Sequence, residues 1–65
     1  MPATFTLEND TLTATQVDGG TEYSASIPLP QRRLQQRSTW ELVLQSKIDR
    51  AIGGESMNDV VLTQV

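Results

Sequence analysis

The chain has 65 residues, a net charge of −3 and neither cysteine nor histidine. It is long enough for one small domain (residues 1–65), and its composition excludes disulfide bonds, Cys/His zinc sites and the histidine base of the familiar nucleophilic enzymes. The acidic balance disfavours non-specific binding to nucleic acid or anionic lipid. No apolar run approaches the roughly 20 residues of a membrane helix and no signal peptide is evident, so we expect a cytoplasmic protein with no membrane partner.

Residues 3–29 carry three runs in which apolar and polar residues alternate, which is the period of a half-buried strand. The runs are residues 3–7, 11–17 and 21–27. Asn9-Asp10, between the first two runs, suits a tight hairpin turn. Gly19-Gly20, between the second and third, can adopt the positive φ angles that hairpin turns require. The pattern predicts a three-stranded antiparallel β-meander.

The alternation gives this sheet one apolar and one polar face. The apolar face comprises Phe5, Leu7, Leu12, Ala14, Tyr23, Ala25 and Ile27. The polar face comprises Thr4, Thr6, Glu8, Thr11, Thr13, Thr15, Ser24 and Ser26. A flat hydroxyl-bearing face suits a protein partner, a second sheet or a carbohydrate, and we take Thr11, Thr13 and Thr15 as its partner-binding residues. The structural alternative is that threonine favours strands and that one face of an antiparallel sheet meets water.

Residues 39–52 show the period of an amphipathic α-helix. The apolar residues at helical spacing are Trp40, Val43, Leu44, Ile48, Ala51 and Ile52. Ser38 and Glu41 have the spacing of a capping box at its start, and Gly53 follows its last apolar residue, where a left-handed glycine commonly ends a helix. We expect this helix to cover the apolar face of the sheet, with Trp40 as the largest contribution to the core.

Residues 31–37 lead from the sheet to the helix, after two prolines that end the third strand. A helix extended back through this segment would place Arg33 and Arg37 on the same side as Trp40, where two buried guanidinium groups would be costly. We therefore predict a basic linker or a separate short helical turn over 31–37. A continuous helix from which both arginines reach outward is the alternative.

All five cations fall within residues 31–50, which carry a net charge of +3, whereas residues 1–30 hold four acids and no cation. Arginine can bind phosphate through two parallel hydrogen bonds and glutamine can contact base edges, so the basic segment is a candidate nucleic-acid interface. Its residues would be Arg32, Arg33, Arg37 and Arg50. The interpretation that we favour is that the segment neutralises the acidic hairpins of the same chain or of a neighbouring subunit.

Two further features have alternative interpretations. Leu42 falls on the side of the helix opposite the apolar stripe, where it anchors a dimer or partner contact unless residues 31–37 or the C-terminal run cover it. Residues 60–65 are rich in strand-forming side chains and form either a fourth strand, which we favour, or a frayed tail.

The sequence therefore predicts an α+β fold, a meander with one helix packed on it. We expect a small protein-interaction or regulatory module, such as an accessory protein of a bacterium or a phage, that binds a protein partner or a second copy of itself. Nucleic-acid binding through the segment Arg32–Arg37 is the alternative. No enzymatic activity, cofactor or metal is expected, because no catalytic constellation or clustered carboxylate pattern is present.

Overall fold

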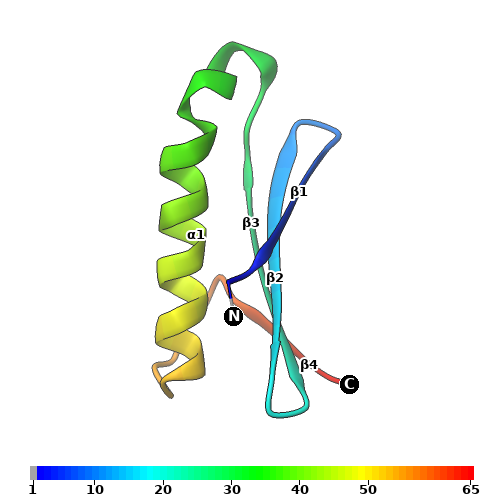
Figure 1. Cartoon of the computed structure of the whole chain (residues 1–65), viewed down its shortest axis with the longest axis vertical. Coiled ribbons are helices and arrows are strands. Elements are labelled where there is room, and N and C mark those ends of the chain that lie inside the picture. Colours follow the sequence, from blue (N-terminus) through cyan, green and yellow to red (C-terminus); the bar gives the residue numbers. More distant parts are fainter. Residues whose placement is uncertain (1) are drawn as a thin grey trace.

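In the computed structural model, which describes residues 2–65, a four-stranded antiparallel sheet packs against one α-helix (Figure 1). The strands lie in chain order, β1-β2-β3-β4. The elements are β1 (Thr4–Glu8), β2 (Thr11–Asp18), β3 (Thr21–Pro28), the 3₁₀-helix η1 (Gln31–Gln36), α1 (Arg37–Ile52) and β4 (Val61–Gln64). The predicted α+β fold is confirmed, and so is the strand at the C-terminal end. Within residues 2–65, no helix is long and apolar enough to cross a membrane.

Two tight turns connect the first three strands. The central residues of both turns have positive φ: 52° and 59° at Asn9 and Asp10, and 59° and 81° at Gly19 and Gly20. Positive φ at both central positions gives a turn whose twist matches that of the flanking strands, so two residues suffice to join them. Both predicted hairpins are therefore confirmed, including the one built without glycine.

The strand register assigns the two faces of the sheet. Phe5 pairs with Ala14, which pairs with Ala25, so these side chains share one face. That face lies against α1, as predicted. Leu12 and Ala14 of the central strand β2 are fully buried, while Phe5 and Tyr23 at its margins are half-buried against the same core.

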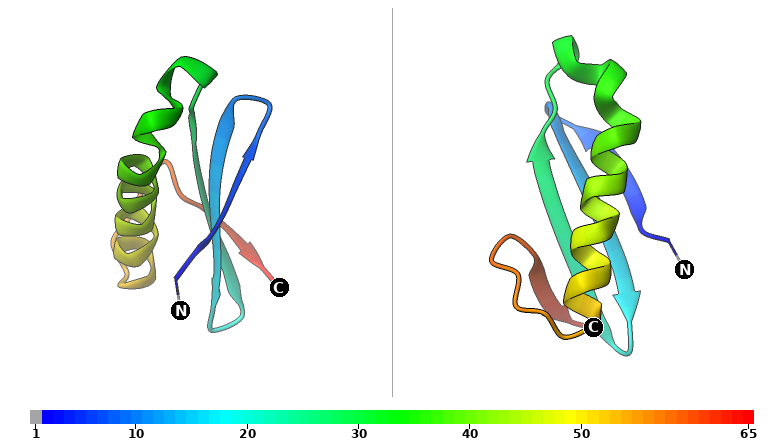
Figure 2. Two further views of the ribbon diagram at one scale, coloured as in Figure 1. Left: turned by 45° about the horizontal axis from the view of Figure 1, so that its top comes forward. Right: turned by 90° about the vertical axis from the view of Figure 1, so that its left-hand side faces the viewer.

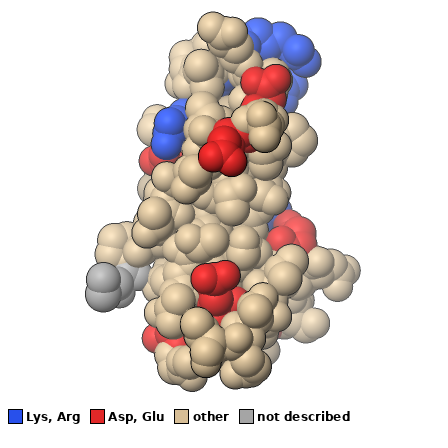
Figure 3. All heavy atoms as spheres, turned by 90° about the vertical axis from the view of Figure 1, so that its right-hand side faces the viewer, with Lys and Arg blue, Asp and Glu red and all other residues tan. Residues whose placement is uncertain are grey.

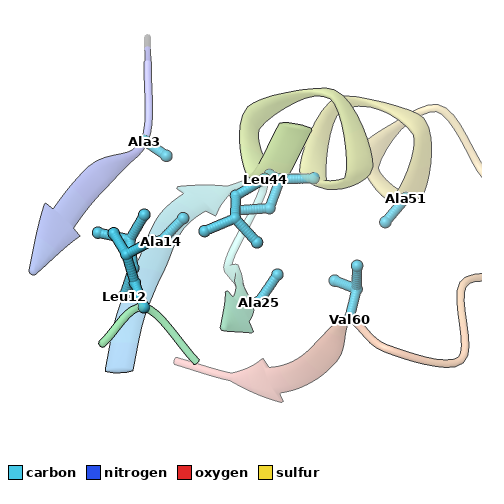
Figure 4. Close-up of a cluster of buried hydrophobic side chains, with 9 residues drawn as sticks. Ala3, Leu12, Ala14, Ala25, Leu44, Ala51 and Val60 are labelled. Carbon is cyan, nitrogen blue, oxygen red and sulfur yellow. The ribbon is translucent and has the colours of Figure 1, made fainter. Parts of the chain in front are cut away.

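The core lies between α1 and the middle of the sheet. α1 contributes Leu44, Ile48 and Ala51, spaced four and three residues apart, so that they form one stripe along the helix. In the close-up of Figure 4, Leu44 points toward the sheet between Ala14 and Ala25. Because these two alanines are small, they leave room for the side chain of Leu44. Leu44 is therefore completely buried although the apolar stripe of α1 is narrow.

Trp40 contributes less to the core than expected. The indole is half-buried and packs against the core, whereas the largest fully buried side chains are Leu12, Leu29, Leu44 and Ile48. Trp40 lies in the first turn of α1, and its Nε1 donates a hydrogen bond to Gln36 Oε1 at 3.4 Å on an exposed part of the surface. An indole N–H needs a polar partner, and this one finds it at the rim of the core.

The start of α1 differs from the capping box predicted for Ser38 and Glu41. The helix begins at Arg37, and its N-cap residue, Gln36, makes no side-chain capping hydrogen bond. Glu41 instead accepts a hydrogen bond from Arg37 Nε at 2.9 Å, one helical turn earlier. Because η1 leads directly into α1, Ser38 and Glu41 lie inside the helix and do not form a capping box at its start.

The end of α1 uses the second glycine of the Gly53-Gly54 pair. Gly53 has a φ of −74°, so the prediction of a left-handed conformation there is wrong, whereas Gly54 has a φ of +97°. The amide of Gly54 donates to the carbonyl of Ala51 at 3.1 Å, and that of Glu55 to the carbonyl of Arg50 at 3.0 Å. These two bonds form a Schellman motif, which requires its positive φ one residue beyond the C-cap.

Residues 31–37 contain the predicted break before the helix. η1 covers Gln31–Gln36 and ends where α1 begins, so the separate short helical turn is confirmed and a continuous α-helix is not. Arg37 belongs to α1 and is half-exposed rather than buried. The buried Leu29 anchors the preceding loop, and its amide donates to the carbonyl of Asp10 at 2.7 Å.

Candidate interaction surface

Among residues 2–65, no helix or strand covers the face of the sheet opposite α1. Its central rows consist of hydroxyl side chains: Thr4, Thr15 and Ser24 align across three strands, as do Thr6, Thr13 and Ser26. Figure 3 looks onto this side of the molecule and shows a central band without charged groups. We call this surface, comprising Thr4, Thr6, Thr11, Thr13, Thr15, Ser24 and Ser26, the hydroxyl face.

The hydroxyl groups of this face are mostly free to bond to a partner. Thr11 Oγ1 donates to the carbonyl of Asn9 at 3.3 Å. Within residues 2–65, the other hydroxyls of the hydroxyl face make no hydrogen bond to the protein. Each can donate one hydrogen bond and accept others, so the face offers both kinds of polar contact without carrying charge.

A shallow depression opens at one end of the hydroxyl face. It has a volume of about 290 Å³ and is lined by Pro2, Thr4, Thr15, Gln16, Val17 and Glu22. The depression exists because β1 begins opposite Thr15, whereas β2 and β3 continue for three more residue pairs. Val17 is left without a neighbour on the β1 side and is exposed.

Leu42 and the threonines, which the sequence suggested as partner-binding residues, lie on opposite sides of the protein. Leu42 is 73% exposed on the outer side of α1, so neither η1 nor the C-terminal segment covers it. Thr11, Thr13 and Thr15 lie on the other side of the sheet from the helix. One flat partner cannot contact both, so they represent two separate candidate surfaces.

The four arginines suggested for nucleic-acid binding do not form one surface either. Arg32 and Arg33 are exposed in η1, while Arg50 lies in the last turn of α1, a helix of 16 residues that is about 24 Å long. The largest patch of basic groups in Figure 3 lies at the upper end, where η1 is found. Arg37 is engaged by Glu41.

Three of the five cations form ion pairs inside the chain. Besides Arg37 with Glu41, Lys47 pairs with Asp59, and Arg50 Nη2 donates to Glu55 Oε1 at 3.1 Å. These acids belong to α1 and to the segment before β4, so the acidic hairpins of the same chain do not supply the partners of these three cations. For Arg32 and Arg33, the described part of the chain holds no ion-pair partner.

Hydrogen bonds within two of the ion pairs shift the pKa of Arg50, Glu55 and Asp59. The hydrogen bond from Arg50 holds the pKa of Glu55 below its ordinary value, and the same bond raises the pKa of Arg50. The hydrogen bond from Lys47 likewise lowers the pKa of Asp59. Both pairs are exposed, and both connect α1 to the segment that leads into β4, so they help to position that strand.

Gln45 is a residue whose role the sequence did not reveal. Its Oε1 accepts a hydrogen bond from the Ala3 amide at 2.7 Å, and its Nε2 donates to Gln16 Oε1 at 2.9 Å and to Asp49 Oδ1 at 3.0 Å. Gln45 of α1 thus forms hydrogen bonds both to the residue that precedes β1 and to a side chain of β2. The four-residue spacing from Asp49 was visible in the sequence, but the contacts with the sheet depend on tertiary structure.

No group of three or more His, Cys, Asp or Glu side chains that could hold a metal ion is found within residues 2–65. No protein-family model matches the chain, and neither does any curated protein or solved structure. No family therefore supplies a function for it.

Proposed function

We propose that this protein is a small non-enzymatic interaction or regulatory module that binds a protein partner through the hydroxyl face, with Thr13 at its centre. The observation that carries the proposal is the uncovered side of the sheet, whose two central rows contain only threonine and serine across β1, β2 and β3, with Val61 of β4 next to Ser24. Thr11 and Thr15 flank Thr13 on the same strand and would complete the contact.

The chemistry of the hydroxyl face favours a protein over a charged ligand. Specific interfaces have about the same polarity as the rest of a protein surface and are depleted of charge at their centre, which matches a neutral field bordered by Glu8 and Glu22. A standard interface buries about 800 Å² on each partner. That is roughly a fifth of the 4464 Å² accessible here.

The residues present give little support to catalysis. The chain has no histidine and no cysteine, and among the described residues that line the depression, Glu22 is the one with an ionisable side chain. General acid–base chemistry uses two positioned groups with different pKa values, and a single exposed carboxylate does not provide them.

Nucleic-acid binding is the second candidate, and it is supported by Arg32 and Arg33 of η1, which are exposed and have no ion-pair partner among residues 2–65. It has less support than the first because Arg37 and Arg50 are already engaged by acids of the same chain. Binding through η1 would weaken steeply with salt, since phosphate contacts release counterions. Replacing both Arg32 and Arg33 with alanine would abolish it.

Two matched variants test the proposed function. Thr13→Lys places a charge at the centre of the hydroxyl face, and Thr39→Lys makes the same change at an exposed position of α1. Each tagged variant is used to capture partners from nuclease-treated lysate of the native host. We expect Thr39→Lys to retain the proteins captured by the unmodified chain and Thr13→Lys to lose them. Equal capture by both variants would refute binding through this face, and capture lost on nuclease treatment would favour the second candidate.

A further inference from the structure

The outer edge of β4 is the feature that neither the core nor the hydroxyl face explains. β4 is the last strand of the sheet, and all four of its residues are exposed. In the right-hand view of Figure 2, α1 crosses in front of β2 and β3, while β4 begins to one side of the helix and runs toward the C-terminus near its lower end. Both faces and the free edge of this strand are therefore accessible.

The direction of the free backbone groups follows from one hydrogen bond. The Val65 amide donates to the carbonyl of Gly20, so Val65 points its backbone groups toward β3. Alternate residues of a strand point the same way, so Val61 and Thr63 also bond toward β3, opposite Ser24 and Glu22. The N–H and C=O groups of Leu62 and Gln64 must then point away from the sheet, where no strand of the described residues pairs with them.

β4 lacks the features that usually prevent edge strands from pairing. Such features are lysine or other charges, proline, and bulges. Residues 60–65 contain no charged residue and no proline. By contrast, Glu8 ends the other edge strand, β1, and Pro28 ends the part of β3 that extends beyond β4.

β4 and the residue after it expose apolar side chains on both faces of the sheet, beside the polar Thr63 and Gln64. Leu62 is 57% exposed on the face that bears α1, beside its cross-strand neighbour Tyr23. Val61 and Val65 are 63% and 80% exposed on the opposite face. A partner that covers these residues would need a strand of its own, with apolar side chains on both faces and no charge.

We infer that β4 pairs with β4 of a second copy of this chain, antiparallel about a two-fold axis, to form a continuous eight-stranded sheet. The chain itself supplies a strand with the required properties. With Thr63 on the two-fold axis, Leu62 of each copy lies opposite Gln64 of the other. In each of these two pairs, the free N–H and C=O groups form hydrogen bonds to each other. The same register sets Val61 opposite Val65 of the second copy, so the most exposed apolar side chains of the strand cover each other.

Charge also favours β4 as the contact between two copies. Each copy has a net charge of −3, so most approaches are repulsive, whereas residues 60–65 carry no charged side chain. Glu22 is the nearest acid along the row of Thr63. The two copies of Glu22 would lie three strand spacings apart, about 14 Å, which exceeds the screening length of about 8 Å in physiological salt.

The contact is small, so we expect a reversible dimer with a dissociation constant in the micromolar range. The inference goes beyond the proposed function and does not rest on it. Thr13 lies on β2, two strands away from β4, so Thr13→Lys should abolish partner capture and leave the dimer intact. Either proposal can thus fail alone.

Sedimentation equilibrium from about 1 μM to about 1 mM tests the inference. We expect the mass to rise from 7.2 kDa toward twice that value, 14.4 kDa, and to go no higher, because a two-fold contact closes. Leu62→Lys should weaken association at least tenfold. Leu42→Lys, the same change at an exposed leucine of α1, should leave it unchanged. A mass of 7.2 kDa throughout, or disruption by Leu42→Lys in place of Leu62→Lys, would overturn the inference.

Two additional measurements examine the edge itself. Gln64→Pro removes an N–H that points away from β3, so it should abolish the dimer while the monomer remains folded. In the unmodified chain, amide exchange at Leu62 and Gln64 should slow as protein concentration rises, while that at Val61 and Thr63 should stay constant. Concentration-independent exchange at Leu62 and Gln64 in a dimeric sample would place the contact elsewhere and overturn the inference.

Discussion

Leu42 and Leu44 lie two residues apart in α1, and their exposed fractions are 73% and 0%. The same substitution, leucine to alanine, should therefore have very different effects at the two positions. Leu44→Ala leaves a cavity that the facing Ala14 and Ala25 are too small to fill, so its cost falls near the middle of the known range, about 3 to 4 kcal/mol. Leu42→Ala removes no buried contact and replaces one strong helix former with another, so its cost should stay within about 0.5 kcal/mol.

The total stability determines how large these effects will be. A domain of 65 residues has a free energy of unfolding of about 3 to 10 kcal/mol, so Leu44→Ala removes a third of it or more. Urea unfolding followed by circular dichroism, at the lowest usable protein concentration, measures both variants without a contribution from self-association. Equal losses at the two positions, or a greater loss for Leu42→Ala, would show that α1 does not pack on the sheet through this side.

Three further predictions concern the contacts that hold the elements together. Gln45→Ala should destabilise the fold by about 1 to 2 kcal/mol and speed amide exchange at Ala3, whereas Gln35→Ala, at an exposed position of η1, should do neither. Gly54→Ala forces an L side chain to a φ of +97° and should cost about 1 to 2 kcal/mol, while Gly53→Ala, at −74° with ordinary contacts, should cost less than half as much. Ion pairs hold the pKa of Glu55 and of Asp59 below their ordinary values of 4.5 and 3.8, so the native state gains stability above these values and loses it as pH falls through and below them. The double variant Glu55→Gln/Asp59→Asn should flatten the decline of the urea midpoint between about pH 5 and pH 3, and an unchanged decline would contradict this assignment.

The sheet could be predicted from the sequence because its signals are local. Asn9-Asp10 and Gly19-Gly20 are residue pairs that tolerate positive φ, and the alternation on either side of them determines which side chains face the helix. Once the length of each turn is known, the pairing of the strands and the face on which each side chain lies follow from it. The hydroxyl face, including Thr13, therefore follows from the sequence alone.

The ends of the helix were harder to predict because several residues can perform the same role. Ser38 could cap a helix, but Arg37 already lies in the first turn and pairs with Glu41. Gly53 and Gly54 can both adopt positive φ, and the hydrogen bonds of the last turn select the second. Such one-residue differences depend on the geometry of the finished turn, which the residue types alone do not specify.

The ion pairs and the role of Gln45 could not be predicted because they depend on tertiary structure. Lys47 meets Asp59 because the chain reverses after Gly54 and returns to place β4 beside β3. The sequence indicated the basic segment but not its partners. Arg32 and Arg33 are the exposed cations of η1. Arg37 and Arg50 form ion pairs with acids of the same chain, so the four arginines do not form one basic surface.

Photo-crosslinking in the native host tests the central claim most directly, because it reports which side of the protein meets a partner at native concentration. A photoreactive residue replaces Thr13 on the hydroxyl face in one strain and Thr39 on α1 in another. The account predicts a discrete adduct to another protein from position 13 and none from position 39. An adduct from position 39 with none from position 13 would contradict it.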